Sequence, residues 1–255
     1  MALDSNGGIK GLIMQLQHFS VNDGDGIRTV IFMAGCPLRC KWCCNPESWS
    51  LEINEYVDEM SIPEIIDEVD RQIIFYRYSN GGITYSGGEP TYQLNFLENM
   101  VDIFYNRGIH QSIETSGYFI WEDVYGVFEK MDFIFVDIKH FNSRRHKQLT
   151  GVHNHSILDN IRAMGRLGKD IVIRIPLIKD INDDEGNIAD TAEFVYRNIP
   201  NGKIELLPYH SLGNYKYKSL GLDEYEYSFQ TPDEEDIQRV KEIINSYDVQ
   251  TIEYR

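Results

Sequence analysis

Two hydrophobic periodicities alternate along the chain and predict alternating strands and helices. Short runs rich in β-branched, aliphatic and aromatic residues predict six strands, over Thr29–Met33, Gly82–Ser86, His110–Thr115, Phe133–Ile138, Ile171–Ile178 and Lys203–Pro208. The clearest helix begins at Ser61, where Ser61-Ile-Pro-Glu64 has the pattern of a capping box and an isoleucine-rich stripe continues through Ile74. Further helices are predicted over about Tyr92–Arg107, Trp121–Lys130, Ser156–Leu167, Asp184–Asn198 and Asp233–Tyr247.

This alternation predicts an α/β fold built on a parallel sheet. Right-handed crossovers curl such strand–helix units toward a barrel, and six units are fewer than the eight of a closed one. We therefore expect a partial (β/α)6 barrel whose chemistry lies at the carboxyl ends of its strands. No Pro/Gly/Ser-rich linker divides the chain, which favours a single domain over residues 1–255. Tyr215–Thr231, rich in Tyr, Gly and acidic residues, predicts a long loop with room to move.

The charge of the chain argues against two classes of partner. The formal net charge is −16, so on average a nucleic-acid backbone or an anionic membrane would be repelled. No stretch approaches the roughly 20 apolar residues that cross a bilayer, and the first residues lack the pattern of a signal peptide. We expect a cytoplasmic protein without nucleic-acid or membrane partners.

All four cysteines fall between positions 36 and 44. Cysteines gathered in one short segment suit a metal site rather than a disulfide framework. The spacing C-x-x-x-C-x-x-C lets Cys36, Cys40 and Cys43 offer thiolates to three irons of a [4Fe–4S] cluster and leave the fourth iron open. A zinc knuckle with Cys44 as fourth ligand is the alternative, which the spacing disfavours because adjacent Cys43 and Cys44 cannot easily both point at one tetrahedral ion.

The cysteine segment resembles that of the radical S-adenosylmethionine (SAM) superfamily. The resemblance extends over nearly the whole chain to the glycyl-radical-enzyme activating enzymes, and pyruvate formate-lyase activating enzyme is the most similar architecture. Besides the cysteines, six ordered motifs carry it: Asp23–Arg28, Gly87–Pro90, Glu114–Gly117, Asp137–Lys139, Thr150–His155 and Leu206–Gly213. The chain has no ferredoxin-like insertion between Cys44 and Gly82, which resembles the pyruvate formate-lyase type. The short motifs Cys40-Lys-Trp-Cys and Asn45-Pro-Glu-Ser48 instead resemble the group that carries the insertion. These motifs therefore do not decide which partner enzyme is activated.

The resemblance implies a set of residues that bind SAM: Trp42, Gly87, Gly88, Glu89, Glu114, Asp137, Lys139, Arg174, Leu207 and His210. Gly87 and Gly88 let a ligand approach the backbone closely. Asp137 and Lys139 lie two apart on a strand and share a face, where they grip the ligand or pair with each other. Arg174 lies in an apolar strand and needs a charged partner. Glu114 stands where the family often has an Asp that contacts a monovalent cation.

The activity that the resemblance implies is the installation of a glycyl radical on a partner glycyl radical enzyme, with a flavodoxin or ferredoxin as electron donor. Asp23 and Arg28 precede the first predicted strand, and at the rim of the barrel they would hold the partner's peptide backbone or pair with each other. Two other classes stay open at this point. One is a radical SAM enzyme that acts on a small molecule, and the other is a non-catalytic zinc-binding module.

Overall fold

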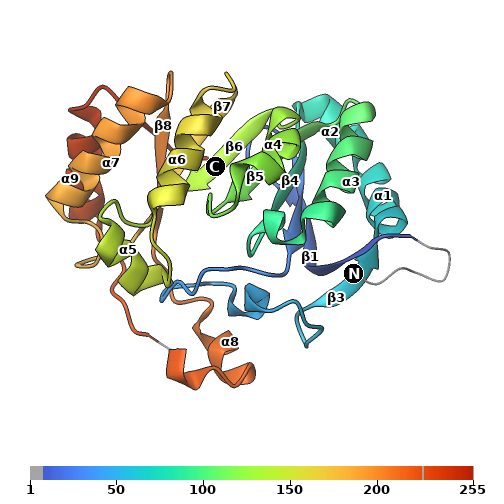
Figure 1. The fold of residues 1–255 in the computed structure, drawn as a ribbon, viewed down its shortest axis with the longest axis horizontal. Helices are drawn as coiled ribbons and strands as arrows, with labels where there is room; N and C mark the ends of the chain where they lie inside the picture. The colour runs from blue at the N-terminus through green and yellow to red at the C-terminus, as the bar shows by residue number, and fades with distance from the viewer. Residues whose placement is uncertain (1–7, 226, 255) are drawn as a thin grey trace.

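The predicted strands form the centre of one mixed sheet. The computed structural model describes residues 8–225 and 227–254, and in these residues the sheet has nine strands in the order β3-β1-β2-β4-β5-β6-β7-β8-β9 (Figure 1). Its parallel part confirms the predicted strands as β2 (Arg28–Met33), β4 (Gly82–Gly87), β5 (His110–Thr115), β6 (Phe133–Asp137), β7 (Asp170–Leu177) and β8 (Lys203–Pro208). Helices connect these strands along the outside of the sheet, so the partial (β/α)6 barrel is confirmed.

Three further strands extend the sheet at its edges. β1 (Lys10–Ser20) pairs antiparallel with β2 and with β3 (Asp58–Ser61), while β9 (Gln250–Ile252) pairs in parallel with β8. Within the described residues no pairing joins β3 to β9, so the barrel is open on one side. The sequence pattern did not predict these strands, because β1 is largely half-exposed and the other two have only four and three residues.

The helices follow the predicted pattern with local differences. Ser61 caps α1 through a capping box with Glu64, as predicted. The isoleucine stripe predicted one helix through Ile74, but the chain turns at Arg71 and Gln72 and a second helix begins there. The helices are α1 (Ile62–Asp70), α2 (Ile73–Ser79), α3 (Leu94–Asn106), α4 (Trp121–Glu129), α5 (Ser143–Thr150), α6 (His155–Gly165), α7 (Glu185–Asn198), α8 (Asn214–Ser219) and α9 (Glu234–Asn245), with short 3-10 turns at Pro46–Trp49, Pro90–Gln93 and Asp223–Tyr225. No helix in the described part of the chain combines the length and apolarity that a bilayer crossing requires.

Three apolar clusters hold these layers together. The largest fills the space between the sheet and its outer helices, with fully buried side chains such as Tyr85 and Phe104. A second cluster packs Leu38 and Trp42 of the cysteine segment against residues such as Leu149 and Tyr209. The third lies on the inner face of the barrel, where Phe135 packs edge-on against the ring of Tyr254. Burial of this apolar surface is the main force that positions the strand ends.

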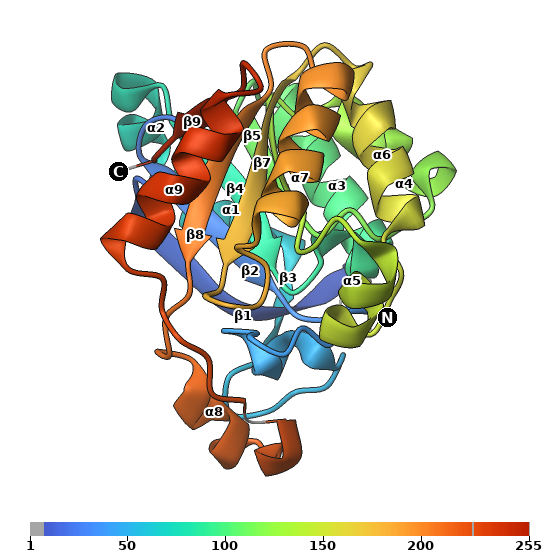
Figure 2. The ribbon, with the colours of Figure 1, turned by 90° about the vertical axis from the view of Figure 1, so that its left-hand side faces the viewer.

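The carboxyl ends of the parallel strands face the cysteine segment and α8, as the arrowheads of β7 and β8 show in Figure 2. The sequence predicted a long loop over Tyr215–Thr231; in the described part of that segment, which excludes Glu226, residues 220–222 and 227–231 lack a helix or strand, and the mobility of the loop stays a prediction. The segment contains the end of α8 and a 3-10 turn, and it packs on the cysteine segment. The Trp49 ring lies edge-on to Tyr217 and Tyr225, with ring centroids 5.8 and 5.3 Å apart.

Candidate functional site

The cysteine segment leaves β2 in a sharp turn. Gly35 has a φ of 90°, a conformation that favours glycine, and its amide donates to the Ser48 carbonyl at 2.7 Å. The Arg39 guanidinium donates to the carbonyl of Cys36 at 2.7 Å, while the Arg39 amide donates to Thr150 at the end of α5. These contacts fix the first half of the segment against α5 and against the 3-10 turn at Pro46–Trp49.

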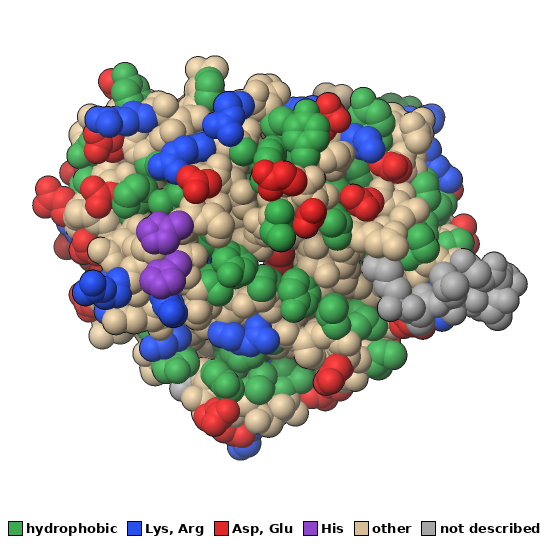
Figure 3. Space-filling view, viewed as in Figure 1, with side chains coloured by type: hydrophobic (Ala, Val, Ile, Leu, Met, Phe, Trp, Pro, Cys, Tyr) green, Lys and Arg blue, Asp and Glu red, His purple; other side chains and the backbone are tan. Residues whose placement is uncertain are grey.

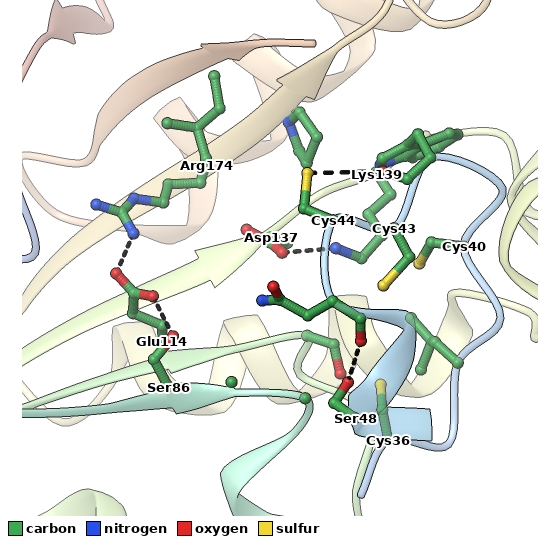
Figure 4. Close-up of a pocket in the computed structure, with 18 of the residues that line it drawn as sticks. Cys36, Cys40, Cys43, Cys44, Ser48, Ser86, Glu114, Asp137, Lys139 and Arg174 are labelled. Carbon is green, nitrogen blue, oxygen red and sulfur yellow. Dashed lines mark hydrogen bonds and ion pairs between the residues drawn. The ribbon is translucent and has the colours of Figure 1, made fainter. Parts of the chain in front are cut away.

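The thiols of Cys36, Cys40 and Cys43 point into one common space (Figure 4). All four cysteines are free thiols, and Cys44 Sγ turns toward the Trp42 carbonyl instead, 4.0 Å away. Among the described residues no three His, Cys, Asp or Glu side chains converge on the position of a single ion. Each iron of a [4Fe–4S] cluster takes one thiolate, so three thiols that surround a common space without meeting at one point fit such a cluster. They fit a zinc knuckle less well, because the ligands of a zinc knuckle all meet at one ion.

Burial raises the pKa of these thiols, and that of Cys43 reaches about 12. The bare thiols therefore stay protonated at neutral pH. Because a metal centre binds thiolates, loading the site would release these protons.

A cavity of about 310 Å³ extends from the cysteines across the strand ends. It is lined by nine of the ten residues expected to bind SAM: Trp42, Gly87, Gly88, Glu114, Asp137, Lys139, Arg174, Leu207 and His210. The structure therefore brings these side chains to one place, although they come from five strand ends and the cysteine segment. The same wall contains residues that sequence reasoning missed, among them Ser48, Ser86 and Tyr209.

The Gly87-Gly88 turn needs its glycines for close packing within the protein, and both residues also line the cavity. A Cβ on Gly88 would overlap the Gly35 carbonyl oxygen and lie 3.0 Å from the Ser48 Cβ, while one on Gly87 would overlap the Met33 backbone. The Gly88 amide also donates to the Met33 carbonyl at 2.9 Å. The close approach that the glycines permit is therefore to the start of the cysteine segment.

Glu89 requires a correction. Its side chain is fully buried and, unlike Gly88, does not line the cavity. The carboxylate accepts hydrogen bonds from Thr91, from the Thr115 hydroxyl at 2.9 Å and from the amide and hydroxyl of Ser116 at 2.8 and 2.6 Å. With its lone pairs engaged in this way, Glu89 fastens the end of β5 to the turn after β4 rather than contacting a ligand.

Arg174 finds charged partners, as its position in an apolar strand requires. Its Nε donates to Glu205 at 2.7 Å, and its Nη1 forms an ion pair with Glu114. The guanidinium lies 3.7 Å from the Phe135 ring centroid, a cation–π contact. Burial alone would lower the pKa of Arg174, but the two carboxylates raise it. Sequence reasoning missed Glu205 as a partner of Arg174, although a carboxylate within the apolar run of β8 could have indicated a buried ion pair.

Asp137 and Lys139 pair with each other at the end of β6. The Lys139 ammonium donates to the Asp137 carboxylate at 2.6 Å (Figure 4). Burial would lower the pKa of Lys139, but the Asp137 carboxylate raises it, so the ammonium is charged at neutral pH. The cavity thus contains a charged pair directly beside the cysteines.

Glu114 stands between polar neighbours at the end of β5. Its carboxylate accepts a hydrogen bond from the Ser86 hydroxyl at 2.5 Å, next to its ion pair with Arg174. Burial raises the pKa of Glu114 to about 7; Arg174 lowers it, and the Asp23 carboxylate raises it further. A carboxyl with this pKa exchanges its proton near neutral pH.

Arg28, at the start of β2, is buried, so the expected rim position is wrong for this residue, whereas Asp23 is half-buried. Arg28 is fully buried and donates to the Thr84 hydroxyl at 2.7 Å and to the carbonyls of Ile83 and Asp25. The same Thr84 hydroxyl donates to the Asp23 carbonyl at 2.8 Å. Arg28 therefore has no surface for a partner, and it forms no ion pair with Asp23 among the described residues. It fastens the segment that places Asp23 next to Glu114.

Comparisons with known proteins agree with this geometry. The model of the radical SAM superfamily matches residues 30–192. A 4-hydroxyphenylacetate decarboxylase activating enzyme of Clostridioides difficile (strain 630) is 34% identical over 86% of this chain and 88% of its own length. A pyruvate formate-lyase-activating enzyme of Staphylococcus epidermidis is 32% identical over 93% of this chain and 96% of its own. The chain belongs to the radical SAM superfamily, among the enzymes that activate glycyl radical enzymes.

A solved structure supports the same family. The crystal structure of a domain of pyruvate-formate lyase-activating enzyme from Bacteroides vulgatus is 33% identical, covers 68% of this chain and 98% of that chain, and has a TM-score of 0.54.

Proposed function

We propose that this radical SAM enzyme installs a glycyl radical on a partner glycyl radical enzyme, such as pyruvate formate-lyase or a relative. The observation that carries the proposal is the cavity that joins Cys36, Cys40 and Cys43 to the charged strand ends. A bound [4Fe–4S] cluster would supply the electron for reductive cleavage of SAM to the 5′-deoxyadenosyl radical, the species that abstracts a hydrogen atom from the partner's glycine.

In this proposal the residues of the cavity hold three different parts of SAM. Gly87, Gly88, Lys139 and Arg174 would hold the methionine part of SAM, and Asp137 would hold its ribose. Trp42, Leu207 and His210 would line the adenosine part. The support is their common position on the cavity wall, where the Asp137–Lys139 pair lies beside Cys40.

A monovalent cation near SAM is part of the proposal. Glu114 and Asp137 come from adjacent strands, and both line the cavity. Because Arg174 already pairs with Glu114, a cation there would share this carboxylate with the guanidinium.

The substrate in this proposal is a glycine loop of the partner, which enters through the open side of the barrel. An unclosed sheet leaves lateral room for an extended peptide. Asp23 is the residue that we propose to contact this peptide, because its carboxylate is close enough to Glu114 to raise the pKa of that group. Arg28 would not contact the peptide itself. It would act by holding the segment that positions Asp23.

The electron donor that we propose is a flavodoxin or ferredoxin, and α5 supports its docking. This helix has three exposed cations, Arg144, Arg145 and Lys147, and no acidic residue, in a chain with a net charge of −16. Its end accepts hydrogen bonds from the amides of Arg39 and Lys41, on either side of Cys40. A negatively charged redox protein on α5 would therefore lie close to the cluster.

We also propose one domain without an insertion, located in the cytoplasm. The alignment with the decarboxylase activating enzyme spans 285 positions, more than the length of this chain, so that relative contains segments with no counterpart here. A reducing compartment is consistent with four free cysteines.

The test uses reduced protein, SAM and a candidate partner with α-deuterated glycine under anaerobic conditions. We expect deuterium in 5′-deoxyadenosine and a glycyl doublet in the electron paramagnetic resonance spectrum. Cleavage of SAM with neither signal, for every glycyl radical protein of the source organism, would favour the small-molecule alternative. A colourless protein with stoichiometric zinc would favour the zinc-binding alternative.

A further inference from the structure

The second half of the cysteine segment is held by residues from far along the chain. The Tyr217 hydroxyl donates to the carbonyl of Cys43 at 2.9 Å. The neighbouring Lys216 ammonium donates to the carbonyl of Cys44 at 3.1 Å and to Asn45 Oδ1 at 3.2 Å. Two consecutive side chains of α8 thus bind two consecutive carbonyls of the cysteine segment.

These contacts are buried and closely packed. Tyr217 is 2% exposed, and the Lys216 ammonium forms an ion pair with Glu47, which is 6% exposed. A Cβ on Gly213, just before α8, would lie 2.6 Å from the Cys44 carbonyl oxygen. A side chain there would push α8 away, so the glycine keeps the helix in contact with the segment.

The first half of the segment has different supports. The Arg39 side chain binds the Cys36 carbonyl, and the Arg39 and Lys41 amides bind α5. Beyond Cys40, the described contacts of the Cys43 and Cys44 carbonyls come from α8. The position of Cys43 therefore depends on an element that the sequence motif of the cysteines does not contain.

We infer that Lys216 and Tyr217 are positioning residues for the third cysteine, and that α8 acts as a clamp which keeps Cys43 directed at the cluster site. The inference deepens the proposed function in that it takes Cys43 as a cluster ligand. The clamp itself can be measured in the protein without the cluster.

The experiment compares matched substitutions on the same short helix. Tyr217→Phe and Lys216→Met remove the two donors, while Tyr215→Phe and Lys218→Met change exposed neighbours of the same types. In the cluster-free protein we measure the iodoacetamide alkylation rate of each cysteine by mass spectrometry. Loss of one hydrogen bond, worth about 1 kcal/mol, corresponds to about fivefold easier local opening. We expect an increase of about fivefold at Cys43 and Cys44 in Tyr217→Phe, which loses one hydrogen bond, a larger increase in Lys216→Met, which loses two and an ion pair, and wild-type rates at Cys36 and in both controls.

A second measurement uses the reconstituted protein. We expect Tyr217→Phe and Lys216→Met to bind less iron and sulfide than the controls, and to change the electron paramagnetic resonance spectrum of the reduced cluster. Since Lys216→Met leaves Glu47 buried without its counter-charge, the double variant Lys216→Met/Glu47→Gln tests the clamp in a fold without that unpaired charge. Equal alkylation rates in all variants would overturn the clamp. A wild-type protein that binds no cluster would instead overturn the proposed function, and the alkylation result would still stand.

Discussion

Gly88 lies directly against Gly35, so the turn after β4 and the start of the cysteine segment form one packed unit. Gly88→Val should therefore disturb the cluster as well as SAM binding, because the new side chain displaces the Gly35 carbonyl. Iron content and SAM calorimetry measure the two effects. Gly126→Ala is the matched control, since a Cβ there meets no atom within 4 Å. A Gly88→Val protein with a full cluster and no SAM binding would contradict this coupling.

The three thiols in the common space should be needed together. Cys36→Ala, Cys40→Ala and Cys43→Ala should each lose the cluster and SAM cleavage, because each removes the protein ligand of one iron. Cys44→Ala should keep both, since its thiol turns toward the Trp42 carbonyl. Visible absorbance after anaerobic reconstitution and 5′-deoxyadenosine formation measure the outcome. Cluster loss in Cys44→Ala would show that the ligand assignment is wrong.

The stability of the protein should depend on pH through Glu114. Its pKa is raised from the usual 4.5 to about 7, with burial as the largest cause, so the folded chain keeps a proton that the unfolded chain releases. The free energy of unfolding contributed by this group therefore falls as pH rises from about 4.5 to 7 and is constant above that window.

Glu114→Gln removes this contribution. Urea unfolding of cluster-free wild type and variant at pH 5 and pH 8 should show wild type losing stability relative to the variant at the higher pH. An unchanged difference between the two proteins would count against the raised pKa.

The Arg174 ion pairs should be important for folding as well as for SAM. Arg174 and Glu205 have side chains only 8% and 6% exposed, so Arg174→Met leaves buried carboxylates without a counter-charge. We expect a loss of about 3–5 kcal/mol in the free energy of unfolding. Arg162→Met, at an exposed ion pair, should cost less than about 1 kcal/mol in the same urea titration. Similar losses for both variants would be inconsistent with a buried network.

Reduction by an acidic redox protein should depend on α5. Arg144→Gln combined with Lys147→Gln should slow cluster reduction by a flavodoxin by about tenfold at low salt, because electrostatic steering is lost. Reduction by dithionite, which needs no docking surface of this kind, should be unchanged. The double variant Arg166→Gln/Lys169→Gln, in the loop after α6, removes the same amount of charge and provides the control. If both pairs of substitutions have the same effect, α5 is not the docking site.

The sequence predicted the site better than it predicted the role of each residue. Asp137, Arg174 and Leu207 meet in one cavity because the carboxyl ends of parallel strands lie at one edge, a rule that needs no coordinates. Glu89 and Arg28 were misinterpreted because their partners, such as Ser116 and Thr84, are distant in sequence. A motif identifies a residue type at a position, but the direction of its side chain depends on packing.

The structure of the segment after β8 was hard to predict for the same reason, because it depends on packing against residues that are distant in sequence. Its tyrosines, glycines and acidic residues are typical of a loop, and no periodicity of six residues can predict a helix such as α8. Its order comes from contacts with Trp49 and with the carbonyls of Cys43 and Cys44.

The contact between Tyr217 and Cys43 joins residues 174 positions apart, and this separation sets an order of events during synthesis. Chains emerge from the ribosome amino end first, so the three cysteines that we propose as ligands are exposed long before α8 exists. The nascent protein therefore has its thiols without the element that holds the third one in place. Assembly of a stable metal centre has to wait until most of the polypeptide has been translated, and a truncated chain that ends before α8 would expose reactive cysteines.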